Sequence, residues 1–249
     1  MPTFSHFDGE NAIDGEFSMK LLRHFSLSVG STYVREKEGG NISDGFHNIE
    51  TTAKWQFITS AKHELLLSTG VGVEWGGSGS TLIGAEETTT IAPALYFGKG
   101  FGDLPDSMKW ARPFAVTGVA SYALPAHRFT ADGERNANEF NFGGSIQYSL
   151  PYFNSQVRAL GWPNWAVRFI PLVEFNYARR SHNFGAEPAT SFVNPGIIWV
   201  GRYVQLGAEA RVPLNRASGH GVGFALQLHF FLDDIFPHTI GAPLLGDRL

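Results

Sequence analysis

The chain has 249 residues, among them 29 glycines, 21 phenylalanines and no cysteine, and its formal net charge is -4. Only 17% of the residues are charged, below the roughly 25% of an average soluble domain, and nothing provides the basic field that nucleic-acid binding needs. The lack of cysteine excludes disulfides, thiol nucleophiles and Cys-based zinc sites, and no apolar run reaches the roughly 20 residues of a transmembrane helix.

Alternation of apolar and polar residues, the pattern typical of β-strands, runs through most of the chain. Strands are predicted first over 15–22 and 25–33, and then over 47–59, where Trp55 and Phe57 share one face and Glu50 and Lys54 share the other. Further strands are predicted over 65–73, 91–97, 114–122, 138–150, 164–178, 193–199, 204–212 and 222–232. About eleven strands are therefore visible, and most are longer than the usual strand of a globular sheet.

Long strands with one continuous apolar face favour an all-β fold, an antiparallel up-and-down transmembrane β-barrel of about 12 strands. In such a barrel the apolar face points outward to lipid and the polar face lines the interior, because backbone groups within hydrocarbon must be paired internally. We therefore expect Trp55 to face lipid, and Glu50 and Lys54 to face the interior. A soluble lipocalin-like barrel that binds one ligand predicts the opposite polarity and only eight strands.

The predicted connections alternate in length, as they do in outer-membrane barrels with short periplasmic turns and longer extracellular loops. Short or medium joins fall at 23–24, 60–62, 99–109, 151–163 and 201–202, and longer ones at 35–45, 75–87, 125–136, 179–189 and 213–221. Tryptophan follows this alternation, as an aromatic girdle would: Trp55, Trp110, Trp162, Trp165 and Trp199 lie beside the first group, and Trp75 lies beside the second.

An odd number of strands conflicts with the even number of bacterial single-chain barrels. Residues 1–15 also have neither a basic start nor an apolar core, so no signal peptide is recognised. One hypothesis is that residues 1–249 form a single barrel domain that lacks its first strand, in which case 15–22 and 222–232 would meet in a parallel seam. The alternative is that Pro2–Phe7 is itself a short first strand and that the signal has been removed.

Charged residues on the polar face are the candidates for lining the interior, because charges at membrane depth must be paired or hydrated. The lumen-lining candidates are Glu50, Lys54, Glu64, Arg168, Glu174, Glu209 and Arg211. They would either shape a permeation path or form a salt-bridge network that plugs a narrow barrel. Pro93, Pro171 and Pro195 lack an amide hydrogen, so bulges or edges are expected beside them.

The last predicted strand, "GFALQLHFFL", resembles the terminal strand of bacterial outer-membrane proteins, although a tail over 233–249 follows it here. In pattern and layout the chain resembles the outer-membrane channel proteins of the meta-pathway phenol-degradation type. This resemblance implies a bacterial outer-membrane channel or transporter for small solutes, with hydrophobic or aromatic molecules as candidates. The implied partners are outer-membrane lipid, the solute and the barrel-assembly machinery, with no nucleic acid, cofactor or metal.

Two further functions remain open. A closed structural or surface-interaction barrel would carry the same sequence features and differ only in conductance. An outer-membrane lipid hydrolase would need an activated hydroxyl, and "SHN" at Ser181, His182 and Asn183 offers the residue types. Because consecutive residues of a strand point to opposite faces, and because this group falls in a predicted loop, we expect no enzymatic activity.

Overall fold

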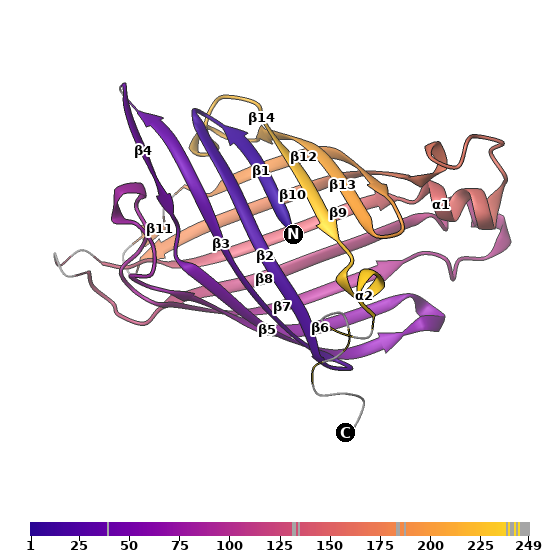
Figure 1. Ribbon diagram of the computed structural model, residues 1–249, viewed down its shortest axis with the longest axis horizontal. Coiled ribbons are helices and arrows are strands. Elements are labelled where there is room, and N and C mark those ends of the chain that lie inside the picture. The colour runs from indigo at the N-terminus through magenta and orange to yellow at the C-terminus, as the bar shows by residue number, and fades with distance from the viewer. Residues whose placement is uncertain are drawn as a thin grey trace.

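The computed structural model describes residues 1–38, 40–130, 133, 135–182, 185–186, 188–237, 239, 242 and 244. Twelve strands form a closed antiparallel β-barrel (Figure 1). The barrel strands are β1 (Pro2–Phe7), β2 (Glu10–Leu22), β3 (Phe25–Glu38), β5 (Ile49–Ser60), β6 (Leu65–Trp75), β7 (Thr90–Gly100), β8 (Phe114–Pro125), β9 (Asn138–Tyr148), β10 (Phe169–His182), β12 (Thr190–Val200), β13 (Val204–Pro213) and β14 (Gly223–Phe230). Each pairs with its neighbours in chain order, and β14 pairs with β1.

Two further strands extend the hairpins beyond the barrel. β4 (Asn41–Phe46) pairs with the distal half of β3, and β11 (Gly185–Ala186) pairs with the end of β10. The predicted loop over 35–45 is therefore largely strand, because the alternation of β3 continues past the barrel wall. The helices are short: η1 (Ala61–His63), η2 (Thr81–Ile83), η3 (Asp106–Ala111), α1 (Leu150–Tyr152), η4 (Phe153–Val157), η5 (Ala166–Arg168), η6 (Arg216–Ser218) and α2 (Leu232–Ile235). Within the described ranges, no helix is both long and apolar enough to cross a bilayer.

The first strand is Pro2–Phe7, which the sequence left as an alternative to a missing strand. It pairs antiparallel with β2, where Phe4 lies opposite Ile13, and antiparallel with β14, where Phe4 lies opposite Leu226. The expected parallel seam between 15–22 and 222–232 is therefore wrong, because β1 lies between these two segments. Closure needs no further strand.

β1 is much shorter than the neighbouring β2, and Figure 1 shows the N-terminus partway along the wall. Where β1 begins, the Met1 carbonyl accepts a hydrogen bond from the Glu16 amide of β2 at 3.0 Å. Farther along β2, the Lys20 carbonyl accepts a hydrogen bond from the Leu244 amide at 3.1 Å. A cavity of about 430 Å³ lies here between β2 and the segment around α2. Toward the α1 end, β1 therefore no longer separates β2 from β14, and the cavity lies between residues of these two strands.

The outer surface is a continuous apolar belt, as predicted from the alternation. Trp55 is 53% exposed and Val71 is 45% exposed, and Leu95, Ile146 and Leu226 on other strands are likewise exposed. Cross-strand pairs such as Val71 with Ala53 keep these residues on one face around the barrel. A water-soluble protein rarely exposes an apolar surface of this extent, whereas a lipid-facing barrel requires it.

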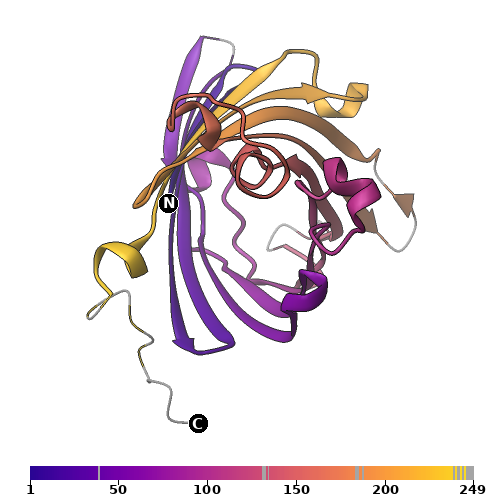
Figure 2. The same cartoon turned by 90° about the vertical axis from the view of Figure 1, so that its right-hand side faces the viewer.

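Connections alternate between the two ends. The α1 end carries the connections 23–24, 61–64, 101–113, 149–168 and 201–203, and the opposite β4 end carries those after β1, β3, β6, β8, β10 and β13 (Figure 1). The predicted assignment of connections to the two ends is therefore correct, but the predicted alternation of length holds only in part. The connection 149–168 lies at the end expected to carry the shorter joins and is the longest between barrel strands, and the connection after β1 at the other end consists of residues 8–9 alone. Figure 2 looks at the α1 end and shows the coil of α1 and η4 in front of part of the barrel opening. Within this coil Phe153 is buried, and its ring lies 5.3 Å from that of Trp110.

Prolines interrupt the ladders without shifting the register. Pairing of β7 with β8 skips Ala92 and Pro93 and then resumes in the same register, and pairing of β12 with β13 skips Asn194 and Pro195. Pro171 lies just beyond the end of the β9–β10 pairing. The expected bulges do not occur beside these prolines; the register shifts instead near Lys20 and Gln56.

Candidate functional site

The interior of the barrel is the candidate site, and five of the seven predicted lumen-lining residues lie on its strands. Glu50 and Lys54 belong to β5, Glu174 to β10, and Glu209 and Arg211 to β13. All five share the face opposite to the exposed apolar belt, since side chains alternate along each strand. Glu50 is exposed although it faces inward, so solvent reaches this part of the interior.

Glu64 and Arg168 do not lie in the barrel wall. Glu64 ends η1 in the left-handed conformation, at φ 47°, and Arg168 is the exposed last residue of η5. Both belong to connections at the α1 end. Sequence alternation placed them on strands because apolar spacing continues through "NWAVRF" and "AKHELLL", where the backbone in fact turns.

A group of carboxylates lies on one side of the interior, on β2, β5 and β6. Glu50 lies directly opposite Glu74, and Glu16 lies across Gly30 from Glu50. Asn48, which is 1% exposed, donates from Nδ2 to Glu74 Oε1 at 2.9 Å. Among the described residues, neither Glu50 nor Glu74 is in an ion pair, so this side of the interior carries net negative charge.

Lys54 is held beside the ring of Tyr96 instead of beside a carboxylate. Its Nζ lies 4.2 Å from the ring centroid, a distance at which a cation is attracted to an aromatic face. Gly70 of β6 lies between them, and a Cβ at Gly70 would meet the Ala53 carbonyl oxygen at 2.8 Å and Tyr96 Cε2 at 3.3 Å. The small residue therefore lets the two side chains meet across the intervening strand.

Arg211 makes a second contact of this type, near the β4 end. Its guanidinium carbon lies 4.1 Å from the ring centroid of Phe192 and 4.9 Å from that of Phe7, and the two rings pack edge to face at 5.5 Å. Sequence reasoning missed both phenylalanines. A signal was present for Phe192, which occupies the polar phase of its strand.

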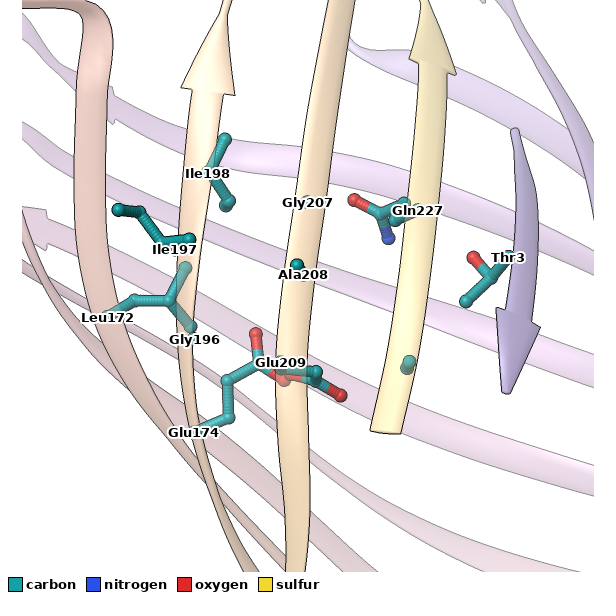
Figure 3. A pocket seen from close by; sticks show the side chains of 11 residues that line it. Thr3, Leu172, Glu174, Gly196, Ile197, Ile198, Gly207, Ala208, Glu209 and Gln227 are labelled. Carbon is teal, nitrogen blue, oxygen red and sulfur yellow. The ribbon is translucent and has the colours of Figure 1, made fainter. Parts of the chain in front are cut away.

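Glu174 and Glu209 approach each other around a small cavity of about 100 Å³ in the inner wall. Figure 3 shows the Glu174 side chain reaching from β10 across β12 toward Glu209 on β13. Gly196 lies opposite Glu209 in the ladder, and a Cβ there would be 2.9 Å from Glu209 Cβ, so only glycine leaves this crossing open. Small residues provide the remaining space, and the other lining side chains include Thr3, Leu172, Ile198 and Gln227.

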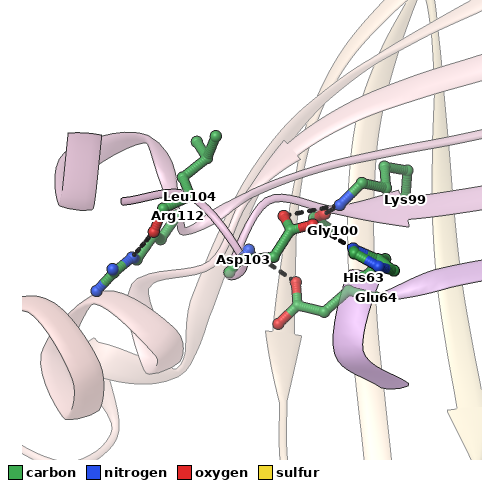
Figure 4. A network of polar contacts seen from close by, with 8 residues as sticks. His63, Glu64, Lys99, Gly100, Asp103, Leu104 and Arg112 are labelled. Atoms are coloured by element: carbon green, nitrogen blue, oxygen red, sulfur yellow. Dashed lines mark hydrogen bonds and ion pairs between the residues drawn. The ribbon is translucent and has the colours of Figure 1, made fainter. Parts of the chain in front are cut away.

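Polar side chains at the α1 end tie two hairpins together (Figure 4). Lys99 Nζ donates to Asp103 Oδ1 at 2.9 Å, His63 Nδ1 lies 3.4 Å from Asp103 Oδ2, and the Gly102 amide donates to Glu64 Oε2 at 2.9 Å. The hydrogen bond from Lys99, helped by that from His63, holds the pKa of Asp103 below its usual value. Arg112 similarly joins the Leu104 carbonyl to Asp106.

In the described ranges no group of three or more His, Asp or Glu side chains could hold a metal ion. Ser181, the residue before the last of β10, has its hydroxyl 3.5 Å from the Asn138 carbonyl, and Asn183 lies outside the described residues. The described residues therefore do not include the complete Ser181, His182 and Asn183 group that the sequence offered for a hydrolase.

Comparison with known proteins identifies the fold. No protein-family model matches the chain, and no curated protein matches it in sequence. Among solved structures the barrel is similar to the NanC porin, with a TM-score of 0.58 at 7% identity over 92% of this chain and 97% of that chain. A membrane protein from work on in-meso crystallization aligns with a TM-score of 0.45 at 10% identity, over 96% of this chain and 87% of that chain. The chain thus has a porin-like fold; membership of the phenol-degradation-type family is not established by these matches.

Proposed function

We propose that this protein is a channel of the bacterial outer membrane and that it passes small hydrophilic solutes, with a preference for cations. The apolar belt supports the membrane location, because a barrel with this polarity would expose its hydrophobic face to water anywhere else. The porin-like fold is consistent with the same location.

The observation that carries the proposal is the unpaired negative charge of the interior. Interior-facing carboxylates on the strands include Asp14, Glu16, Glu50, Glu74, Glu174 and Glu209. Two interior cations, Lys54 and Arg211, lie against aromatic rings, and no ion pair in the described part of the chain joins either to a carboxylate. A third, Arg180 near the β4 end, pairs with Glu139 at 2.9 Å, so the ion pairing of the interior is local. This arrangement does not support the salt-bridge plug, and rings of acidic side chains favour cation passage in known pores.

The charge of the interior also bears on the solute. Hydrophobic or aromatic molecules, which the family resemblance implies, would gain little from carboxylates and would pay to desolvate them. A small cation gains Coulomb attraction along the whole wall, and the attraction weakens as salt screens it. We therefore place cations ahead of neutral aromatic solutes.

Reconstitution into planar lipid bilayers tests the proposal. We expect stepwise currents and, in a KCl gradient, a reversal potential displaced toward the K⁺ equilibrium potential. Replacing Glu50 by Gln should move the reversal potential toward zero, with exposed Glu87→Gln in the connection after β6 as the matched control. Correctly folded protein that inserts without conducting would identify a closed structural barrel.

A further inference from the structure

We infer that the cavity between Glu174 and Glu209 is a binding site for the primary ammonium group of an aliphatic amine. This inference deepens the proposed function and rests on it for the biological meaning of the site, since an amine bound there would be a solute in transit. The site itself can be tested without conductance.

Two carboxylates line the cavity, and no cation is in contact with either of them in the described part of the chain. Among the described residues neither Glu174 nor Glu209 forms an ion pair, and the two repel each other electrostatically. Arg211, the nearest interior cation on β13, is directed against the rings of Phe192 and Phe7. Like charges held close in a partly buried place raise the free energy of the empty site, and a bound cation lowers it.

Asn194 provides an independent indication of a missing donor. It is only 4% exposed, and its Nδ2 donates to Glu209 Oε1 at 3.2 Å, which fixes the amide beside the two carboxylates. Its Oδ1 is buried and has no hydrogen-bond partner in the described part of the protein. A buried acceptor without a donor is costly, and native structures contain few of them.

An ammonium group matches this set of acceptors. It carries three N–H donors and no acceptor; the carboxylates of Glu174 and Glu209 line the cavity as acceptors, and the unpaired Asn194 Oδ1 belongs to the amide that donates to Glu209. Among the described residues the site brings together fewer than the three carboxylate or imidazole side chains that would hold a metal ion. A protonated amine, which donates hydrogen bonds to the available acceptors, therefore fits the site better than a bare metal ion.

The remainder of the cavity selects an aliphatic stem. Leu172 and Ile198 line it from β10 and β12, and Leu172 is buried. Gly196, Gly207 and Ala225 contribute almost no side-chain volume, which leaves space for a short chain of methylene groups. Apolar contact to the stem together with hydrogen bonds to the head is the way proteins accommodate lysine-like groups.

Binding to the purified, folded barrel in detergent tests the inference, with n-butylammonium as the probe and calorimetry as the readout at neutral pH. We expect saturable binding, and at least ten-fold weaker binding of 1-butanol, which has no charge, and of tetramethylammonium, which has no N–H donor. Equal affinity for n-butylammonium and tetramethylammonium would overturn the assignment, because it would indicate a diffuse negative field.

Variants separate the site from charge elsewhere in the chain. Glu174→Gln with Glu209→Gln should weaken n-butylammonium binding at least ten-fold, whereas Glu87→Gln in the exposed connection after β6 should change it less than two-fold. Gly207→Ala adds a methyl group to the cavity without removing charge and should also weaken binding; its Cβ would lie 3.4 Å from Gln227 Cβ, an ordinary van der Waals contact. Unchanged affinity in both site variants, with folding verified by circular dichroism, would disprove the site.

The two proposals fail separately. A barrel that conducts cations but shows no saturable amine binding refutes the amine site and leaves the channel intact. A barrel that binds n-butylammonium in detergent but carries no current in bilayers retains the site and refutes the channel.

Discussion

Val71→Arg places a charge on the lipid-facing side of β6 and tests the inside-out polarity of the barrel. Val71 is exposed and lies four positions before Trp75, the aromatic residue at the β4 end of the same strand. With a rise of about 3.3 Å per residue and a tilt of about 40°, its Cα lies about 10 Å along the barrel axis from that of Trp75. The apolar band of such barrels is about 25 Å tall, so Val71 lies close to the bilayer midplane.

At that depth an arginine costs about 2–4 kcal/mol, and the geometry places Val71 in the middle of this range, at about 3 kcal/mol. The matched control is Ser145→Arg on the interior face of β9. It loses the hydrogen bond between Thr117 Oγ1 and Ser145 Oγ (2.8 Å), worth about 1 kcal/mol, while its new charge enters a solvated acidic interior. We therefore expect the control to cost about 1 kcal/mol or less.

Reversible urea unfolding of the barrel in lipid vesicles, followed by tryptophan fluorescence, measures both free energies. Equal losses from Val71→Arg and Ser145→Arg would contradict the polarity assignment. A barrel that stays folded and monomeric in buffer without detergent would also contradict it, because the apolar belt would then have no lipid to face.

Three further predictions concern single contacts. Gly70→Ala should destabilise the barrel by about 1–3 kcal/mol, because the new Cβ meets the Ala53 carbonyl oxygen. Gly72→Ala is the control and should be tolerated, because the nearest atom to its Cβ is 3.5 Å away. Urea unfolding compares the two variants, and equal losses of stability would argue against the packing described. The folded-state pKa of Asp103 lies below its usual value of 3.8, so the stabilisation that its contacts provide is complete above pH 3.8 and is lost as the pH falls through the lowered pKa. Asp103→Asn should therefore reduce the drop in melting temperature that thermal unfolding shows at acidic pH. An unchanged dependence of the melting temperature on pH would show that the contact is unimportant. Arg211→Gln removes an interior cation and should increase the preference for K⁺ in reversal-potential measurements. Arg202→Gln in the exposed connection 201–203 should leave the reversal potential unchanged. A shift of the reversal potential in both variants would implicate surface charge.

Much of the wall could be predicted from the sequence, because a period of two fixes which face of a strand each residue occupies. Alternation predicts that Trp55 faces outward, together with Val71 and Ile146 of the predicted strands 65–73 and 138–150, and the structure agrees. The same rule left Pro2–Phe7 as one of two alternatives, since six residues with a proline at one end give too few alternations to distinguish a strand from a loop. It also extended the strand of Phe169 backward through Arg168, where a short helical turn keeps a similar apolar spacing.

The arrangement of the site depended on information that alternation does not contain. Glu174 and Glu209 were both expected to face inward, but their proximity depends on the register of β10, β12 and β13 and on the lack of a side chain at Gly196. Contacts across an intervening strand, such as Lys54 with Tyr96, likewise follow from three-dimensional curvature and from a glycine between them. A single sequence specifies faces more readily than it specifies neighbours.

The short first strand has a consequence for the order in which the barrel folds. Hairpins such as β1–β2 and β13–β14 join residues close in sequence and can form early, whereas the β1–β14 junction brings together Thr3 and Gln227 from opposite ends of the chain. Only four residue pairs hold that junction, compared with ten between β9 and β10. The chain between β1 and β14 must be ordered before these four pairs can stabilise the barrel. Pairing of β1 with β14 should therefore be the last and slowest step of folding, and this junction should be the first to separate when the barrel unfolds.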